Sequence, residues 1–125
     1  MDDLRPDLER ALRDAWCRET SEDPGEWTPE NASRGQCAVT SLVIRDLLGG
    51  DILIAEVRRL DGPPIERHAW NRLPSGDEMD LTRDQFRAGE TLGPPEVSEP
   101  QVEIYGRDRF LLLCDAVRSR LGLTT

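Results

Sequence analysis

Apolar residues near the start of the chain recur every three to four positions, which predicts an amphipathic helix over residues 3–18. One face of this helix would cover a core while the charged face meets water. The spacing breaks near Thr20, and residues 20–36 have the Ser, Pro, Gly and Asn content of an irregular loop. A loop of this length in a compact domain is usually functional. The apolar stripe consists of Leu4, Leu8, Ala11, Leu12, Ala15 and Trp16.

The segment from Cys37 to Leu48 predicts a second helix that is apolar around most of its circumference. A helix of this kind belongs in the centre of the core. Gly49-Gly50 ends it, because glycine is the usual residue just past a helix terminus. The run Ile52 to Val57 then has the β-branched and aliphatic composition of a strand buried on both faces.

Two more strands are predicted at residues 66–73 and 77–81, joined into a hairpin by Pro74-Ser75-Gly76. Residues 87–100 have mostly the composition of a loop. Helical spacing returns between Phe110 and Leu121, which predicts a C-terminal helix closing the other side of the core. The elements together predict an α+β fold, in which helices and a small antiparallel sheet share one core.

The whole chain, residues 1–125, has the length of a single domain. Its formal net charge of −9 would repel nucleic-acid phosphates and anionic lipids, so we expect neither nucleic-acid nor membrane partners. The N-terminus has no secretory signal pattern, and no apolar run is long enough to cross a bilayer. Cys17, Cys37 and Cys114 are too irregularly spaced for a disulfide framework. We therefore expect a cytoplasmic protein with free thiols.

Cys37 is the strongest candidate for a chemical role, because it is predicted to begin a helix. The unpaired N–H groups and the dipole of a first helical turn stabilise a thiolate, and the same groups can bind the oxyanion formed when a carbonyl is attacked. Gln36, directly before it, is placed to add a side-chain donor. Cys17 and Cys114 lie on apolar stripes, where a cysteine is usually a packing residue.

A cysteine nucleophile needs a base, and His68 is the single histidine of the chain. An acid or amide that orients the imidazole would complete a triad, and Asn71 and Asp80 both lie near in sequence. A three-residue turn would put Asp80 diagonal to His68 on one face and turn Asn71 to the other. A two-residue turn would place Asn71 opposite Asp80 and separate both from His68. We prefer the first register and Asp80.

Several strings in order resemble the YunG family of small bacterial proteins. They are Gly35-Gln36-Cys37-Ala38-Val39-Thr40 with the later Leu-Leu-Gly-Gly, His68-Ala69-Trp70-Asn71-Arg72-Leu73, and Asp80-Leu81-Thr82-Arg83-Asp84-Gln85-Phe86, with Ala15-Trp16 and Trp27 upstream. The resemblance covers roughly residues 15–86. It implies a papain-like or transglutaminase-like domain, in which a central helix carries Cys37 on a small sheet with His68 and Asp80 on neighbouring strands. The family implies no settled substrate.

These residues lead to a hypothesis of acyl transfer by a Cys37-His68-Asp80 triad on an amide or thioester. The substrate would be a small molecule, a peptide or a carrier-bound acyl group, held near Trp27, Trp70 and Asn71, with Gln36 at the oxyanion. No cofactor is required. Three cysteines and one histidine lack the paired spacing of zinc sites, so no metal is expected. The alternatives are a non-catalytic binding module of the same fold and a transglutaminase-like or glutamine-deamidating activity.

Overall fold

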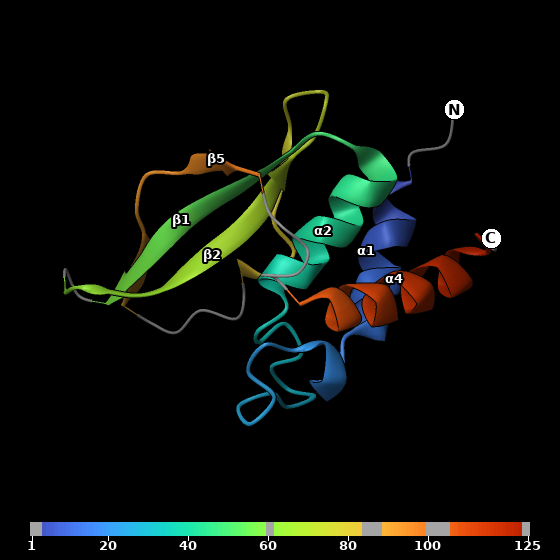
Figure 1. Cartoon of the computed structure of the whole chain (residues 1–125), viewed down its shortest axis with the longest axis horizontal. Helices are drawn as coiled ribbons and strands as arrows, with labels where there is room; N and C mark the ends of the chain where they lie inside the picture. The colour runs from blue at the N-terminus through green and yellow to red at the C-terminus, as the bar shows by residue number, and fades with distance from the viewer. Residues whose placement is uncertain (1–3, 60–61, 84–88, 100–105, 124–125) are drawn as a thin grey trace.

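The computed structural model describes residues 4–59, 62–83, 89–99 and 106–123. Their α-helices gather at one end of a long β hairpin (Figure 1), so the architecture is α+β, as predicted. In chain order the elements are α1 (Arg5–Ala15), the 3-10 turn η1 (Arg18–Thr20), α2 (Cys37–Leu48), β1 (Asp51–Arg59), β2 (Pro64–Arg72), β3 (Glu78–Met79), β4 (Glu90–Leu92), β5 (Glu96–Ser98) and α4 (Arg107–Leu121).

The strands form one antiparallel sheet in the order β3-β2-β1-β4, with β5 also pairing with β1. Strand β1 pairs with β2 along nearly its full length, with Ala55 opposite His68 and Ile54 opposite Ala69. Because side chains alternate between faces, Ala69 packs with Ile52 on the side of α2, whereas Trp70 packs with Leu53 on the other side. The sheet therefore has one face for the helices and a second, smaller apolar face.

Strands β4 and β5 correct the prediction of a loop over residues 87–100. They lie end to end along the outer edge of β1, at Val57–Arg59 and Ile52–Ile54 respectively. Between them the Gly93 N–H donates to the Glu56 carbonyl at 2.9 Å. Prolines 94 and 95 follow, and they have no N–H to donate to a ladder. The prolines that indicated a loop thus lie between two short strands, β4 and β5, which both pair with β1.

The hairpin of β2 and β3 has the predicted three-residue turn. The Leu73 N–H donates to Asp77 O at 2.7 Å, and the Gly76 N–H donates to Leu73 O at 2.8 Å. Asn71 consequently pairs with Met79. Continuing this register puts Asp80 opposite Trp70, which confirms the first of the two predicted alignments. Strand β3 is only two residues long, shorter than the predicted range.

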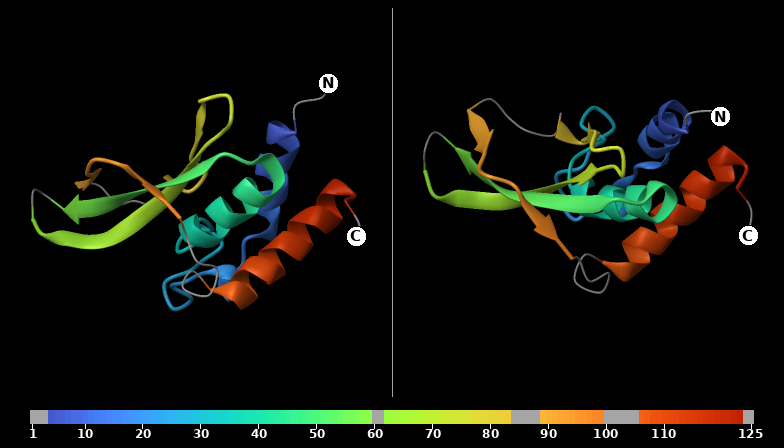
Figure 2. Two further views of the ribbon diagram at one scale, coloured as in Figure 1. Left: turned by 45° about the horizontal axis from the view of Figure 1, so that its top comes forward. Right: turned by 90° about the horizontal axis from the view of Figure 1, so that it is seen from above.

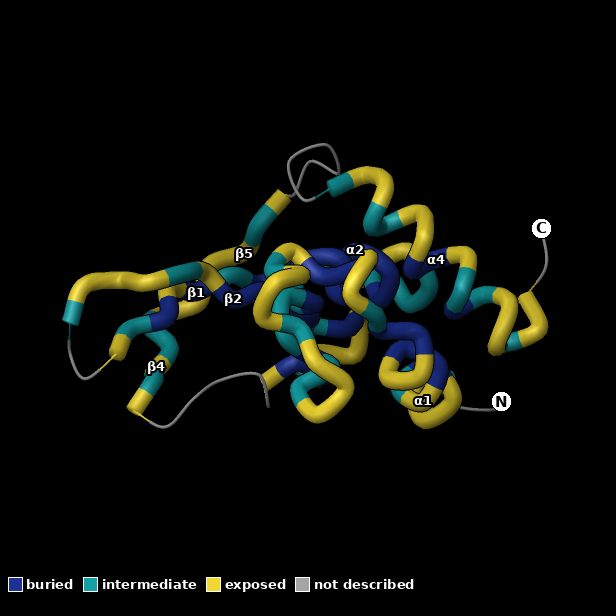
Figure 3. The backbone as a smooth tube through the Cα atoms, turned by 90° about the horizontal axis from the view of Figure 1, so that it is seen from below, coloured by how far each residue is buried: buried dark blue, intermediate teal, exposed yellow. Residues whose placement is uncertain are grey.

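The main core lies between α1, α2 and α4, and it also contains Leu73, Met79 and Leu81 from the hairpin (Figure 2). Helix α2 is the most buried of the three, whereas the far end of the β1–β2 hairpin is largely exposed (Figure 3). Trp16 lies in this core, where its Nε1–H donates to Thr40 Oγ1 at 2.9 Å and joins the end of α1 to α2. None of the described helices has the length and apolarity required to span a membrane.

Gly50 is required by close backbone packing as well as by its conformation, which leads to a stability prediction. Its φ is +88°, and a Cβ there would collide with the Arg72 carbonyl, whereas Gly76 has φ +95° with open space around it. We expect Gly76→Ala to cost about 1 kcal/mol of unfolding free energy and Gly50→Ala about 3 kcal/mol or more. Urea denaturation measures both, and equal costs would contradict the collision at Gly50.

Candidate active site

Cys37 is the first residue of α2, and Gly35 sets the path of the chain that leads into this helix. Gly35 has a φ of +74°, and a side chain there would collide with Ser21, so only glycine lets the preceding loop pack this closely. The first helical bond runs from the Thr40 N–H to Gln36 O at 2.9 Å. The helix itself offers no acceptor to the Cys37 N–H, so this donor is directed toward the space beyond the helix start.

Gln36 is fully buried, and its side chain joins η1 to the start of α2. Its Nε2 donates to Cys17 O at 3.0 Å, and its Oε1 accepts the Thr20 hydroxyl hydrogen at 2.8 Å. One amide hydrogen and the amide oxygen are thus used within the fold. The observed contacts of Gln36 are structural, and only its second amide hydrogen is left for the predicted oxyanion role.

His68 is fully buried on β2, and its Nε2 lies 2.8 Å from Asp80 Oδ2. The imidazole stacks on Trp70 with ring centroids 5.6 Å apart and an interplanar angle of 19°. The Trp70 Nε1–H in turn donates to Glu78 Oε1 at 2.6 Å. Trp70, predicted to contact substrate, is buried, and its ring stacks on the imidazole.

Asp80 accepts two hydrogen bonds besides its contact with the imidazole. Arg83 Nε donates to Oδ2 at 2.8 Å, and the Thr82 N–H donates to Oδ1 at 3.3 Å. Burial alone would raise the pKa of Asp80, but the hydrogen bonds and charges of His68 and Arg83 together lower it below its ordinary value. Asp80 is therefore held as a carboxylate facing His68.

Asn71 and Trp27 lie apart from the His68–Asp80 pair. Asn71 is buried on the opposite face of β2, and its Nδ2 donates to Ser41 O at 3.0 Å, which fastens the strand to α2. The choice between Asp80 and Asn71 as the partner of His68 is thus settled in favour of Asp80. Trp27 donates from Nε1 to Ala32 O at 2.9 Å within its own loop, and it is not among the described residues that line the Cys37 cleft.

Cys37 and His68 meet at a shared cleft on the edge of β2. The backbone N–H of Ala69, the residue after His68, is directed at the Cys37 thiol. Because this N–H points at the thiol, it points away from β1, so the sulfur lies beside the outer edge of β2. The lining residues are Glu22, Cys37, Ala38, Ile54, Arg67, His68 and Ala69.

The thiol is held in its protonated form, contrary to the stabilised thiolate predicted from the helix start. Burial, and to a smaller extent the carboxylates of Glu22, Glu66 and Asp80, raise the pKa of Cys37 to about 12, against the opposing effect of the Ala69 N–H. The sequence pattern showed the helix terminus but not the three acidic side chains, which come from distant parts of the chain. At rest this cysteine is a neutral thiol.

Three further residues of the described chain border the site. Arg83 follows Asp80 at a spacing that lets it reach back to the carboxylate, so the Asp80-Leu81-Thr82-Arg83 string carried a usable signal. Glu22 lies at the cleft because of the path of the loop after η1, and Arg67 because it lies on β2. Neither placement can be seen from local sequence. No cluster of three potential metal ligands occurs within the described ranges, and all three cysteines are free.

Comparison with known proteins identifies relatives but no solved fold. A family model described as YunG protein matches residues 5–122. A Bacillus subtilis (strain 168) chain, "Uncharacterized protein YunG", is 38% identical over 77 residues, which is 62% of the present chain and 58% of the Bacillus protein. The match therefore spans less than two thirds of that relative. No solved structure matches.

The ionised Asp80 predicts a pH-dependent contribution to stability. Since its pKa is lowered by folding, its stabilisation is present above the ordinary carboxyl pKa and is lost as the pH falls through the lowered value. We expect Asp80→Asn to reduce the unfolding free energy by about 2 kcal/mol at pH 7, with the deficit shrinking below about pH 4. Urea denaturation at several pH values measures it.

Asp77→Asn is the matched control, because among the described residues the Asp77 side chain contacts only Arg5, in an exposed ion pair at 3.4 Å, and the substitution keeps its backbone hydrogen bonds. Its loss should change stability by less than about 0.5 kcal/mol. A deficit for Asp80→Asn that stays constant down to pH 3 would show that the carboxylate is not held ionised by folding.

Proposed function

The chain belongs to the YunG family, and we propose that it is a cysteine-dependent acyl-transfer enzyme acting on an amide or thioester. The 2.8 Å contact between His68 Nε2 and Asp80, beside a cleft that Cys37 also lines, is the observation that carries the proposal. A papain-like or transglutaminase-like fold and a cytoplasmic location belong to the same proposal. The order of helix-borne cysteine, strand-borne histidine and neighbouring acid supports it.

In the proposed reaction the Cys37 sulfur attacks the acyl carbon as its proton passes to His68. In this reaction Asp80 contacts Nε2 and the thiol proton passes to Nδ1. The oxyanion is bound by the Cys37 N–H, with the second amide hydrogen of Gln36 as a possible further donor. The bond from carbon to the leaving nitrogen or sulfur then breaks, and the leaving group takes the proton from His68. Water or another nucleophile releases the acyl group from the thioester.

A protonated resting thiol is compatible with this reaction, because proton transfer and attack can occur together. The carboxylate of Asp80 stabilises the imidazolium that forms. The thiol loses its proton only when the acyl carbon of a bound substrate is there to be attacked. The Cys37 thiolate then forms in the enzyme–substrate complex and is not present in the free protein. This differs from a cysteine that is ionised before substrate arrives.

The raised thiol pKa also favours a second candidate, a non-catalytic binding module. A neutral thiol is a weak nucleophile, and the fold can present the same cleft for recognition without turnover. The two candidates differ in whether His68 takes part in the reactivity of Cys37.

An acyl-transfer test uses p-nitrophenyl acetate. We expect release of p-nitrophenolate with an acetyl group on Cys37, detected by peptide mass spectrometry, and loss of more than 100-fold in rate (about 3 kcal/mol) in Cys37→Ala. Cys17→Ala is the matched control, because Cys17 is a partly exposed free thiol elsewhere in the chain. Equal release by wild type and Cys37→Ala would exclude this nucleophile.

A labelling experiment separates the enzyme from the binding module. If His68 activates the thiol, iodoacetamide should modify Cys37 near pH 8, and His68→Gln should slow this by about tenfold or more. Thr91→Ala, a substitution at an exposed position of β4, should leave the rate within about twofold. Labelling that rises only toward pH 12 and is the same in His68→Gln would support the binding module. Circular dichroism checks the fold of each variant.

A further inference from the structure

The cleft around Cys37 is bordered by side chains of both charges. Its polar arm is lined by Glu22, Asp23, Arg34, Gly35, Cys37, Glu66 and Arg67. Its apolar arm is the space beside His68, which Arg67 also lines. A third hollow, between β1, β2 and the β4–β5 edge, is lined by Arg67 as well. Arg67 is therefore the charged residue at which these three spaces meet.

The carboxylates that face Cys37 already have cationic partners. Glu22 lies 3.9 Å from Arg109, and Glu66 lies 3.7 Å from Arg34, which also holds Asp23 at 3.1 Å. These ion pairs satisfy the acidic side of the cleft within the fold. They leave less unbalanced negative charge there than the number of acids suggests.

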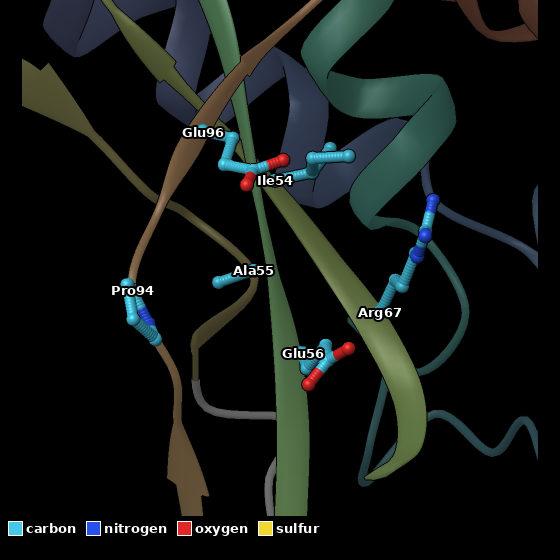
Figure 4. Close-up of a pocket in the computed structure, with 6 residues that line it drawn as sticks. All are labelled: Ile54, Ala55, Glu56, Arg67, Pro94 and Glu96. Carbon is cyan, nitrogen blue, oxygen red and sulfur yellow. The ribbon is translucent and has the colours of Figure 1, made fainter.

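Arg67 has no such partner. All 16 basic residues of this acidic chain are arginines, and neighbours of Arg67 on the same sheet are paired, as with Arg58 and Glu56 or Arg59 and Glu90. For Arg67, no carboxylate of the described residues comes within the 4.0 Å that defines an ion pair. Figure 4 shows its side chain leaving β2 on the side of α2, away from Glu56 and Glu96.

We infer that Arg67 is a specificity residue that binds a carboxylate of the substrate beside the Cys37 nucleophile. Guanidinium donors match the two oxygens of a planar carboxylate, and such a pair would balance the charge of Arg67, which has no ion pair with any described carboxylate. A dianionic phosphate fits less well, because Glu22 and Glu66 lie close to the same thiol. This inference rests on the proposed function, since it assigns a substrate group to that reaction.

The test compares two alkylating reagents of similar size on the full chain. Iodoacetate carries a carboxylate and iodoacetamide is neutral, so the ratio of their rates at Cys37 reports the local charge, and changes in thiol ionisation cancel. Rates are resolved by peptide mass spectrometry and normalised to those of N-acetylcysteine at the same pH. We expect Arg67→Gln to lower the iodoacetate-to-iodoacetamide ratio about fivefold, the effect of one charge a few ångströms away at a partly exposed site.

Two variants control the comparison. Arg67→Lys keeps the charge and should retain most of the ratio, while Arg45→Gln removes an arginine near the far end of α2 and should leave it unchanged. An unchanged ratio in Arg67→Gln, or faster reaction of the cationic reagent 2-bromoethylamine than of iodoacetate in wild type, would overturn the role of Arg67 alone. Failure of iodoacetamide to label Cys37 in any His68-dependent way would overturn the proposed function and this inference with it.

Discussion

The hydrogen bond from the Leu73 N–H to Asp77 O sets the alignment on which the candidate site depends. A slip of one residue would turn every side chain of β3 to the opposite face of the sheet. With the observed register, Asp80 reaches His68 and Trp70 supports the imidazole from below. A short turn far from the cleft thereby determines which carboxyl group can pair with the histidine.

Side chains of β2 on the face opposite His68 hold the strand against α2. Asn71 bonds to Ser41 O on α2, and Ala69 packs against the helix while its N–H is directed at Cys37. Helix and strand are therefore joined by contacts on both sides of the thiol. Because these groups are buried, the position of Cys37 relative to His68 is set by the core rather than by loop conformation.

The residues of this site are arranged for proton transfer, but the charges around Cys37 keep its thiol protonated in the free protein. The acid that orients His68 also contributes, with Glu22 and Glu66, to keeping Cys37 protonated. An imidazole–carboxylate pair can accept the thiol proton when the sulfur reacts, so the same acid keeps the resting thiol protonated and stabilises the imidazolium that forms. Arg67 adds a positive charge at the same cleft, where the other arginines are already paired.

Sequence periodicity alone determined the helices, because apolar residues repeat at 3.6-residue spacing wherever a helix covers a core; α2 has the predicted bounds, and α1 and α4 lie within a few residues of theirs. The sequence also contains a single histidine, and Pro74-Ser75-Gly76 allowed two hairpin registers, of which the structure has the preferred one. Tertiary structure decided the rest. Pairing of β4 and β5 with β1 is a long-range contact that the intervening prolines concealed, and the Gln36 bonds and the thiol pKa depend on groups distant in the chain. Burial and charge are properties of the assembled fold, so local sequence could name Cys37, His68 and Asp80 but not their electrostatic state.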